Sequence, residues 1–504
     1  MEDLYCDSVK LSKLDVSNNR KLLKLECNNN RLTNLEVSNN ATLKVLFCYG
    51  NQLKELDVNN NAALYYLECT NNQLTNLDVS TRHDLRYLYC SWNQLTNLDV
   101  SNNTALRDLG CQMNQLTNLD VSNNAELRNL GCPNNQLTHL DVSNNHALIT
   151  LNCADNQLLE LNLSNNIALT NLMCIRNSLT NLDIRNNTEL IELHCDQNQL
   201  TNLDVNNNTK LTQLWCQDNQ LANLNITNNT LLENLVCGGN QLTNLDISNN
   251  AALTQVECFN NQLANLDVSN NMMLTELWCW SNQLTNLDIS NNTALTQLWC
   301  NYNQLTSLDV SKNTVLESLQ CINNAIPLTN LYALAQQADN IGDKVLGTQT
   351  LPDSTVLLNT PIAIDTVFHG INTVFEVSGG MLGTNYLLNN GAITFLTTGN
   401  YTVSISNPAI ISSPNYPAKV VQTFNVTDGS GIHVIPQAKP LNVWVQDGTL
   451  HVSGLTVGNA WAVYDISGKT VYRNIAESEE ASVSLPVRGV YFVQSGKETI
   501  KAAY

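Results

Sequence analysis

The sequence is short of long apolar runs and of basic charge, and each shortage excludes a class of protein. No window of the 504 residues approaches the roughly 18 consecutive apolar residues of a membrane-spanning helix. Lys and Arg number 24 against 44 Asp and Glu, which gives a formal net charge of −20. Because nucleic-acid binding needs a basic face, we expect an acidic protein that neither spans a membrane nor binds nucleic acid.

Arrangements of residues that support catalysis or metal binding are also missing. No Ser/His/Asp set, Cys/His pair or Gly-rich phosphate loop occurs in a supporting context, and the seven His are scattered. Twelve Asp residues recur at one repeated position, from Asp15 to Asp309. Each is a single carboxylate between buried apolar positions, which favours hydrogen bonding to neighbouring Ser and Thr over the alternative of calcium. We therefore expect no enzyme, no metal and no cofactor.

Cysteine occurs at only one interval. The sixteen cysteines run from Cys6 to Cys321, each 21 residues after the last, and none lies elsewhere. A disulfide framework has irregular spacings, and a zinc site has close pairs. A strict long interval indicates one position in a structural repeat.

The repeat itself has a recognisable pattern. "LTQLWCNYNQL", residues 295–305, reads L-x-x-L-x-C-x-x-N-x-L. It resembles the leucine-rich repeat family over residues 1–325, in sixteen copies. The resemblance implies a solenoid of the nested 21-residue subclass, in which each coil carries two short extended segments. One coil cannot bury its own leucines, so neighbouring coils must stack.

The cysteine and the asparagine of the repeat have structural interpretations. Cysteines of stacked coils would have parallel Cβ vectors about 4.8 Å apart, too far for an unstrained disulfide. We therefore predict a ladder of reduced, buried thiols. The Asn at the ninth position, such as Asn303, is predicted to form an asparagine ladder that caps backbone groups at the turn.

The variable part of the repeat predicts a binding surface. The second half, "TNLDVSNN", returns almost unchanged, whereas the first half varies at its third, fifth and seventh positions. All fourteen aromatic residues before residue 326 lie in first halves, and eleven occupy those three positions. Alternation along a strand directs these positions outward. A constant scaffold with one diversified face is typical of a solenoid that presents a surface to a partner.

The aromatic residues fall into two groups, which we take as the candidate binding residues. Aromatic patches supply contact area at low entropic cost, and they also suit stacking on sugar rings. The alternative is that they only stabilise the sheet as cross-strand pairs. The residues are Trp215, Phe259, Trp278, Trp280, Trp299 and Tyr302 in the later group, and Tyr66, Tyr87 and Tyr89 in the earlier one.

Three arginines form a charged stripe. Arg86, Arg107 and Arg128 occupy the second position of three successive repeats. Like charges at the distance between stacked coils repel one another unless nearby anions neutralise them. A ligand carboxylate or sulfate is one candidate for that role, although nearby Asp84, Asp108 and Glu126 are expected to neutralise the stripe.

Two further domains are predicted after the repeats. Between the repeats and these domains, residues 326–344 are predicted to form a helical cap, with helical spacing from Leu328 to Ala338. Residues 345–435 alternate in short strands and resemble the immunoglobulin-like spacers of bacterial surface repeat proteins. Residues 428–440 are predicted to form a linker.

Residues 436–504 resemble the C-terminal sorting domain of type IX secretion. The resemblance rests on "AWAVYDISGKTVYR" with the turn Gly468-Lys469, on "LPVRGVYFV" with Gly489, and on a closing lysine. It implies a Gram-negative cell and recognition by its export machinery. Export requires a signal peptide, which "MEDLYC" does not provide. Leu4-Tyr5-Cys6 already lies in register with the repeat. We therefore expect the natural protein to carry the signal, and a cap or further repeats, before this sequence, and we expect Met1 to be an added initiator.

Together these features predict a mainly β protein: a leucine-rich repeat solenoid of about 16 coils, then two small β-sandwich domains. The predicted function is that of a secreted or surface-displayed, adhesin-like protein that binds an extracellular protein. A glycan-binding protein and a structural envelope component are the alternatives.

Overall fold

The computed structural model describes residues 1–364, 367–368, 370–389, 391–429, 441–446, 449–495 and 498–503. It divides into two compact units. The first comprises Met1–Ser354, Pro361–Thr394 and Asn400–Asn425, and the second comprises Thr355–Thr360, Phe395–Gly399 and Val426–Tyr504. Residues 430–440 of the predicted linker lie outside the described residues.

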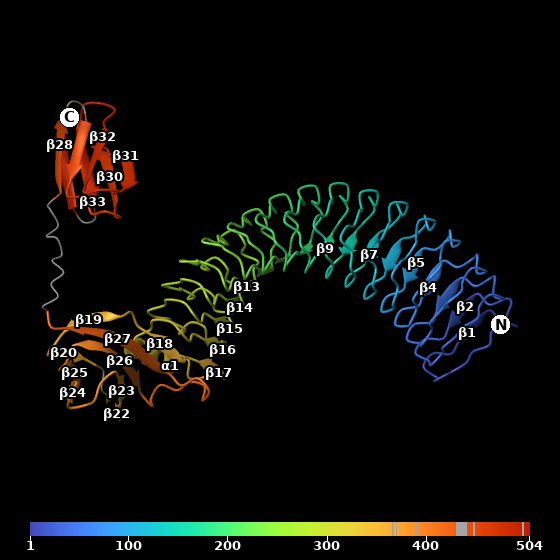
Figure 1. Ribbon diagram of the computed structural model, residues 1–504, viewed down its shortest axis with the longest axis horizontal. Helices are drawn as coiled ribbons and strands as arrows, with labels where there is room; N and C mark the ends of the chain where they lie inside the picture. The colour runs from blue at the N-terminus through green and yellow to red at the C-terminus, as the bar shows by residue number, and fades with distance from the viewer. Residues whose placement is uncertain are drawn as a thin grey trace. The chain divides into compact units, whose positions relative to one another are not determined.

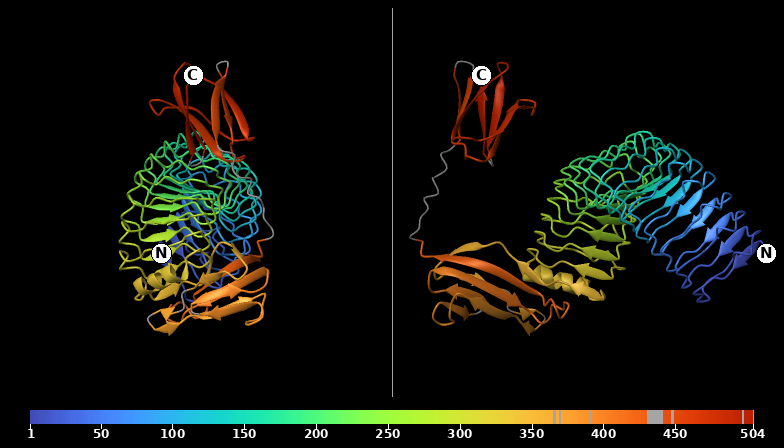
Figure 2. Two further views of the ribbon diagram at one scale, coloured as in Figure 1. Left: turned by 90° about the vertical axis from the view of Figure 1, so that its left-hand side faces the viewer. Right: turned by 45° about the vertical axis from the view of Figure 1, so that its right-hand side comes forward.

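The repeats form a parallel β-solenoid, which confirms the predicted fold class. Each coil contributes one three-residue strand, and consecutive strands pair in parallel and in register (Figures 1 and 2). The strands are β1 (Asp3–Tyr5), β2 (Lys24–Glu26), β3 (Val45–Phe47), β4 (Tyr66–Glu68), β5 (Tyr87–Tyr89), β6 (Asp108–Gly110), β7 (Asn129–Gly131), β8 (Thr150–Asn152), β9 (Asn171–Met173), β10 (Glu192–His194), β11 (Gln213–Trp215), β12 (Asn234–Val236), β13 (Gln255–Glu257), β14 (Glu276–Trp278), β15 (Gln297–Trp299) and β16 (Ser318–Gln320).

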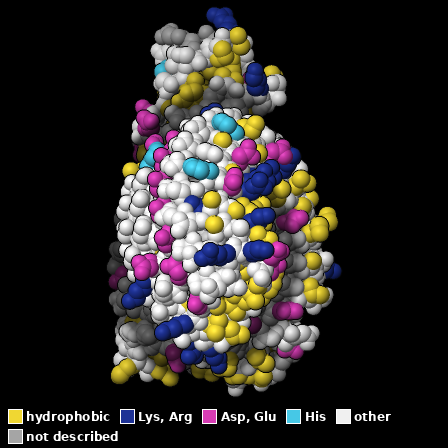
Figure 3. Space-filling model, turned by 90° about the vertical axis from the view of Figure 1, so that its right-hand side faces the viewer, with side chains coloured by type: hydrophobic (Ala, Val, Ile, Leu, Met, Phe, Trp, Pro, Cys, Tyr) yellow, Lys and Arg dark blue, Asp and Glu magenta, His cyan; other side chains and the backbone are white. Residues whose placement is uncertain are grey.

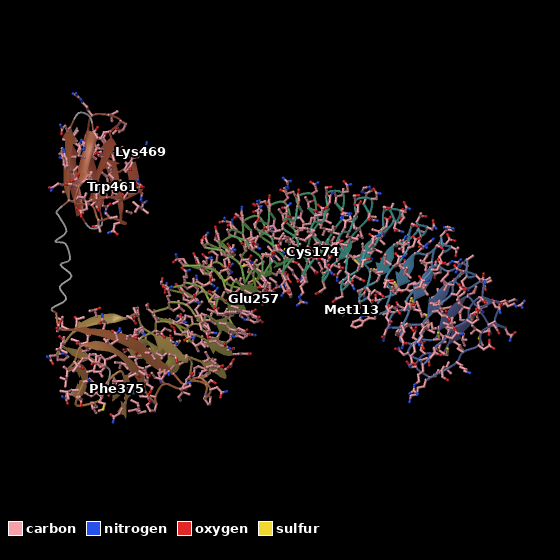
Figure 4. All side chains as sticks on the ribbon, viewed as in Figure 1. Met113, Cys174, Glu257, Phe375, Trp461 and Lys469 are labelled. Atoms are coloured by element: carbon pink, nitrogen blue, oxygen red, sulfur yellow. The ribbon has the colours of Figure 1, made fainter. Side chains whose placement is uncertain are left out.

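Coils are numbered here by their cysteines, so that coil 15 contains Cys300. Within each strand the central residue points into the core and its neighbours point outward, as the period of two predicts. In coil 15, Leu298 and Cys300 are fully buried while Trp299 is half-buried. The leucines and cysteines of successive coils form one apolar cluster, and Figure 4 labels Cys174 within it.

The cysteine ladder is reduced, as predicted. All sixteen cysteines are free, and all but Cys6 are buried. Each backbone amide of the ladder joins the next coil: the Cys300 amide donates to the carbonyl of Gln320 at 2.9 Å. Burial raises the pKa of these thiols, for Cys153 to about 12. The ladder is therefore apolar packing rather than redox chemistry.

The predicted asparagine ladder is also present. Asn303 Nδ2 donates to the carbonyls of Cys279 and Cys300, at 3.0 and 3.1 Å. Its Oδ1 accepts the amide of Leu284 at 3.0 Å. With a further bond to the Asn301 carbonyl at 3.2 Å, one side chain thus satisfies four buried backbone groups in two coils.

A second asparagine ladder, which the sequence analysis did not predict, runs through the constant half-repeats. Asn292 Nδ2 donates to the carbonyls of Val268 and Asn271, at 2.9 and 2.8 Å. Arg82 interrupts this ladder in coil 4 and is 2% exposed. Its Nη2 donates to the Asn59 carbonyl at 2.7 Å, whereas its Nε and Nη1 have no partner in the described structure.

The second extended segment predicted for each coil does not form a paired strand. Between second half-repeats, the described residues contain one isolated bridge, Asp15 to Glu36. The reason is local, because the Asp at this position binds its own chain. The amide of Ser290 donates to Asp288 Oδ1 at 3.0 Å, and this turn removes the donor from a ladder. The Asp row is accordingly a row of hydrogen-bonding residues, as predicted.

The C-terminal end of the solenoid is closed by the helix α1 (Leu328–Gln337) and by the strand β17 (Asp343–Val345), which pairs with β16. Leu328, Leu331 and Leu334 are buried in the solenoid cluster. The following strands are β18 (Thr348–Thr350), β19 (Ser354–Leu357), β20 (Pro361–Ala363), β21 (Val367–Phe368), β22 (Ile371–Asn372), β23 (Val374–Ser378), β24 (Tyr386–Asn389), β25 (Ala392–Phe395), β26 (Gly399–Ser406) and β27 (Lys419–Thr427).

The C-terminal part of the chain contains two small antiparallel sheets around a separate core that includes Trp461, Val463 and Tyr491. The first sheet is β28-β29-β32 and the second is β31-β30-β33-β34. Their strands are β28 (Asn442–Gln446), β29 (Thr449–Ser453), β30 (Ala460–Asp465), β31 (Thr470–Ile475), β32 (Glu480–Ser484), β33 (Val490–Ser495) and β34 (Glu498–Ala503).

The reduced ladder predicts how the thiols react. In the native protein iodoacetamide should alkylate Cys6 at most, because the other fifteen thiols are buried and the thiolate is the reactive form. Intact-mass and peptide mass spectrometry measure this, with the protein unfolded in guanidinium chloride as the control in which all sixteen react. Rapid native labelling of an interior cysteine, or a disulfide in the non-reduced protein, would contradict the ladder.

Candidate functional site

The aromatic candidates line the strand-bearing face of the solenoid in two clusters. The tyrosine patch comprises Phe47, Tyr66, Tyr87 and Tyr89 in coils 3 to 5. Tyr66 lies edge-on to Phe47 at 4.9 Å between ring centroids, and it stacks on Tyr87 at 5.1 Å. Tyr89 is 5.8 Å from Tyr66. The three tyrosines are half-buried against one another.

The tryptophan patch comprises Phe259, Trp278, Trp280 and Trp299 in coils 13 to 15. Trp278 and Trp299 are register partners, and their rings stack at 4.4 Å with planes 7° apart. Phe259 and Trp280 stack at 4.6 Å and 1° in the adjacent row. The structure thus brings together four of the later candidates as two parallel stacks.

Trp215 belongs to the same row as Trp278 but not to the same cluster. Val236 and Glu257 occupy the two coils between them. Trp215 instead packs against His194, at 4.6 Å between ring centroids. The indole Nε1 atoms of Trp215 and Trp278 are buried without a partner in the described structure, whereas Trp299 Nε1 donates to Ser318 Oγ at 3.3 Å.

Tyr302 lies off the strand face. It occupies the eighth position of its coil, where the chain turns with a φ of 54°, and its side chain is 52% exposed. Trp92 has the same place in coil 5, with a φ of 52° and 53% exposure. Bulky residues are unusual in the left-handed region. These two aromatics therefore extend the edge of the surface at a local backbone cost.

The expected neutralisation of the arginine stripe is wrong. Among the described residues, none of Arg86, Arg107 and Arg128 forms an ion pair. Asp108 has another partner, because its carboxylate accepts a hydrogen bond from the side-chain amide, Nδ2, of Asn129. Backbone bonds keep the stripe in register: the Arg128 amide donates to the Arg107 carbonyl at 2.7 Å. The three arginines thus have no carboxylate partner among the described residues.

Two hollows of the solenoid lie away from the aromatic face. One is lined by His139, Glu160 and Asp183, and another by Glu55, Asp57 and Asp78, all in the region of the second half-repeats. In the described part of the chain, no three His, Cys, Asp or Glu side chains are grouped to hold a metal. No helix found there is long and apolar enough to cross a membrane.

Comparison with known proteins identifies the family. The functional domain of InlJ from Listeria monocytogenes, a structure that includes a cysteine ladder, is 31% identical. The match covers 84% of this chain and 90% of that one, with a TM-score of 0.71. The chain belongs to the internalin-like leucine-rich repeat family. No protein-family model matches the sequence, and no curated protein matches it.

Two other structures share the solenoid fold. The leucine-rich repeat protein LIC12759 of Leptospira interrogans is 24% identical over 68% of this chain and 88% of its own, with a TM-score of 0.56. The plant peptide hormone receptor RGFR1, solved in complex with RGF2, is 20% identical over 70% of this chain and 68% of its own, with a TM-score of 0.57.

Sequence reasoning missed one residue of this surface, Glu257. It occupies the fifth position of coil 13, directly beside Trp278, and is 9% exposed. Figure 4 labels it on the strand-bearing side. Burial, with a smaller contribution from the charge of Glu276, raises the pKa of the Glu257 carboxyl. The signal was available, since Glu257 holds the same repeat position as Trp278 and Trp299.

The packing of the tryptophan patch predicts the effect of one glycine substitution. A Cβ at Gly238 would lie 2.7 Å from the Phe259 ring, which is held on its other side by Trp280. We expect Gly238→Ala to lower the free energy of unfolding by about 1–3 kcal/mol, as overpacking does.

Gly131→Ala is the matched control, because the nearest atom to its Cβ lies 3.7 Å away, and its effect should stay within about 0.5 kcal/mol. Guanidinium chloride titration followed by tryptophan fluorescence measures both. Equal stability of the two variants would show that Phe259 is free to move.

Proposed function

We propose that this chain is a secreted or surface-displayed, adhesin-like protein that binds an extracellular protein partner through the aromatic face of its solenoid. The observation that supports this most directly is the pair of stacks in the tryptophan patch. They form a rigid apolar surface on a regular sheet, and rigid aromatic residues dominate protein interfaces. The tyrosine patch adds a second such surface eight or more coils away.

The geometry favours a protein over the glycan alternative. Sugar recognition by stacking needs an open ring face, but Trp278 and Trp299 cover each other at 4.4 Å. Phe259 and Trp280 do the same, and Gly238 lies against the other face of Phe259. The stacks therefore offer mainly ring edges and a broad contact area, and the Trp278 face that Trp299 does not cover adjoins Glu257. Such surfaces suit a protein partner better than a single sugar ring.

A screen tests this function. The 504-residue chain is immobilised and probed with extracellular-matrix proteins, mucins and a glycan array. We expect saturable binding to a protein that weakens at least about tenfold in Trp278→Ala/Trp299→Ala, because aromatic anchors carry most interface energy.

Trp444→Ala is the control, since Trp444 is 45% exposed in the C-terminal sheets and should not affect binding. Circular dichroism confirms that the variants fold. Binding to glycans alone would support the glycan alternative. A double variant that binds like the parent would leave the tryptophans as scaffold and favour a structural envelope component.

We also propose that residues 345–435 form an immunoglobulin-like spacer and that the C-terminal sheets act as a type IX sorting domain in a Gram-negative cell. A support for the second point is the turn at Gly468, which has a φ of 85°. Asp465 Oδ1 accepts the amides of Ser467 and Lys469 there, at 2.9 and 3.0 Å.

Sorting predicts that deleting residues 441–504 stops surface display in a host with type IX secretion. The truncated protein should accumulate in the periplasm, because the export machinery no longer recognises it. Cell fractionation with immunoblotting measures this. Deletion of coils 7 and 8, which leaves the C-terminal sheets intact, is the control. Normal display of the truncated protein would refute the sorting role.

A further inference from the structure

The tryptophan patch lies in a stretch of the solenoid that has no basic residue. Residues 211–311 contain eight Asp and Glu but no Lys or Arg. Residues 1–130, which carry the tyrosine patch, contain twelve Lys and Arg. Figure 3 shows basic and acidic side chains intermingled with hydrophobic ones at that end of the solenoid. The two aromatic patches therefore lie in different electrostatic surroundings.

Glu257 is the buried charge of the tryptophan patch. Its neighbours in the fifth row are Val236 on one side and Trp278 on the other. The Gln255 side chain donates to Glu257 Oε1 at 2.6 Å, and this partner is neutral. Within the described chain, the Glu257 carboxylate forms no ion pair. A buried carboxylate without a cation is costly, and an incoming cation would relieve that cost.

The chain itself contains a completed version of this arrangement, in coil 2. Glu26 occupies the fifth row, between Tyr5 and Phe47 in the neighbouring coils. Lys24, two residues earlier, lies 2.5 Å from the Glu26 carboxylate. Its ammonium also lies over the rings of Tyr5 and Phe47, at 5.2 and 5.5 Å from their centroids. A carboxylate between rings is thus completed here by a cation.

Coil 13 has the same framework with one change. Gln255 takes the third-row place that Lys24 has in coil 2, so the cation is missing while the carboxylate and an aromatic neighbour remain. Glu276, in the third row of coil 14, adds a second carboxylate beside Gln255. Charge and ring both favour a cationic side chain at this point, supplied from outside the chain.

We infer that coils 13 to 15 bind a Lys or Arg side chain of a basic segment in the protein partner, held between the Glu257 carboxylate and the Trp278 indole. This inference rests on the proposed function and specifies the chemistry of the partner. The stacked Trp299 and the adjacent Phe259–Trp280 pair supply the apolar surface around the cation. Gln320 occupies the fifth row in coil 16, so the framework accepts Gln at the position of Glu257.

The test uses hexalysine and hexaarginine as probes and the full chain, by isothermal titration calorimetry at about 0.15 M ionic strength. We expect saturable binding of the basic peptides that depends on Glu257, whereas any binding of hexaglutamate should not depend on Glu257. Glu257→Gln should weaken binding about tenfold, and Trp278→Phe should weaken it less, because Phe is the poorer cation–π partner.

Asp267→Asn is the matched control. It removes the same charge from the other half of coil 13, and Asn already occupies this position at Asn162, where the Ser164 amide donates to Asn162 Oδ1 at 3.1 Å. Its effect should stay below about twofold, since exposed charges act weakly at this ionic strength.

Four results would overturn the inference. The first is an absence of saturable binding, and the second is equal weakening by Glu257→Gln and Asp267→Asn, which would mean general attraction only. The third is self-association in light scattering that Glu257→Gln abolishes, since the occupant would then be a second copy. A protein from the screen that needs Trp278 and Trp299 but not Glu257 would refute the basic segment and leave the proposed function standing.

Discussion

Stacking in register is the constraint on which the rest of this structure depends. A coil of this length cannot enclose its own leucines, so its apolar side chains are buried only against the coils before and after. The backbone groups that turn the chain inside the core must also be paired, since an unpaired buried group costs about 1–3 kcal/mol. Asn303 and Asn292 represent the two ladders that pair them, and each reaches into the preceding coil. The ladders therefore set the register that the outward residues inherit.

Register also determines how the surface is built. Residues at one repeat position lie in straight rows with the spacing of parallel strands, about 4.8 Å. Trp278 and Trp299 stack because that spacing is close to the centroid separation of two stacked rings, here 4.4 Å. A glycine in the row gives a ring room to lie across the neighbouring coil, as Gly238 does for Phe259. Stacking along a row covers the ring faces within each stack and leaves the ring edges exposed. This is a consequence of the repeat itself.

The sequence predicts the parts of this structure that follow from the repeat and fails where one residue departs from it. The cysteine interval predicted a reduced ladder, and the ninth-position Asn predicted a cap, because both follow from stacking alone. The second ladder was missed, since constancy of "TNLDVSNN" does not say which Asn turns inward. Asp108 was expected to answer the arginines but bonds to Asn129 instead. Arg82 shows the same limit, because nothing in the sequence marks it as buried.

A solenoid also restricts how charges are neutralised. In a globular domain a charge can find a partner from any distant segment, whereas here only the same coil and its two neighbours are within reach. Lys24 answers Glu26 from within its own coil. Glu257 has only the neutral Gln255, and the three arginines of the stripe form no ion pair among the described residues. Charges of opposite sign are therefore left without an ion-pair partner in the two halves of the solenoid, each beside one of the two aromatic patches.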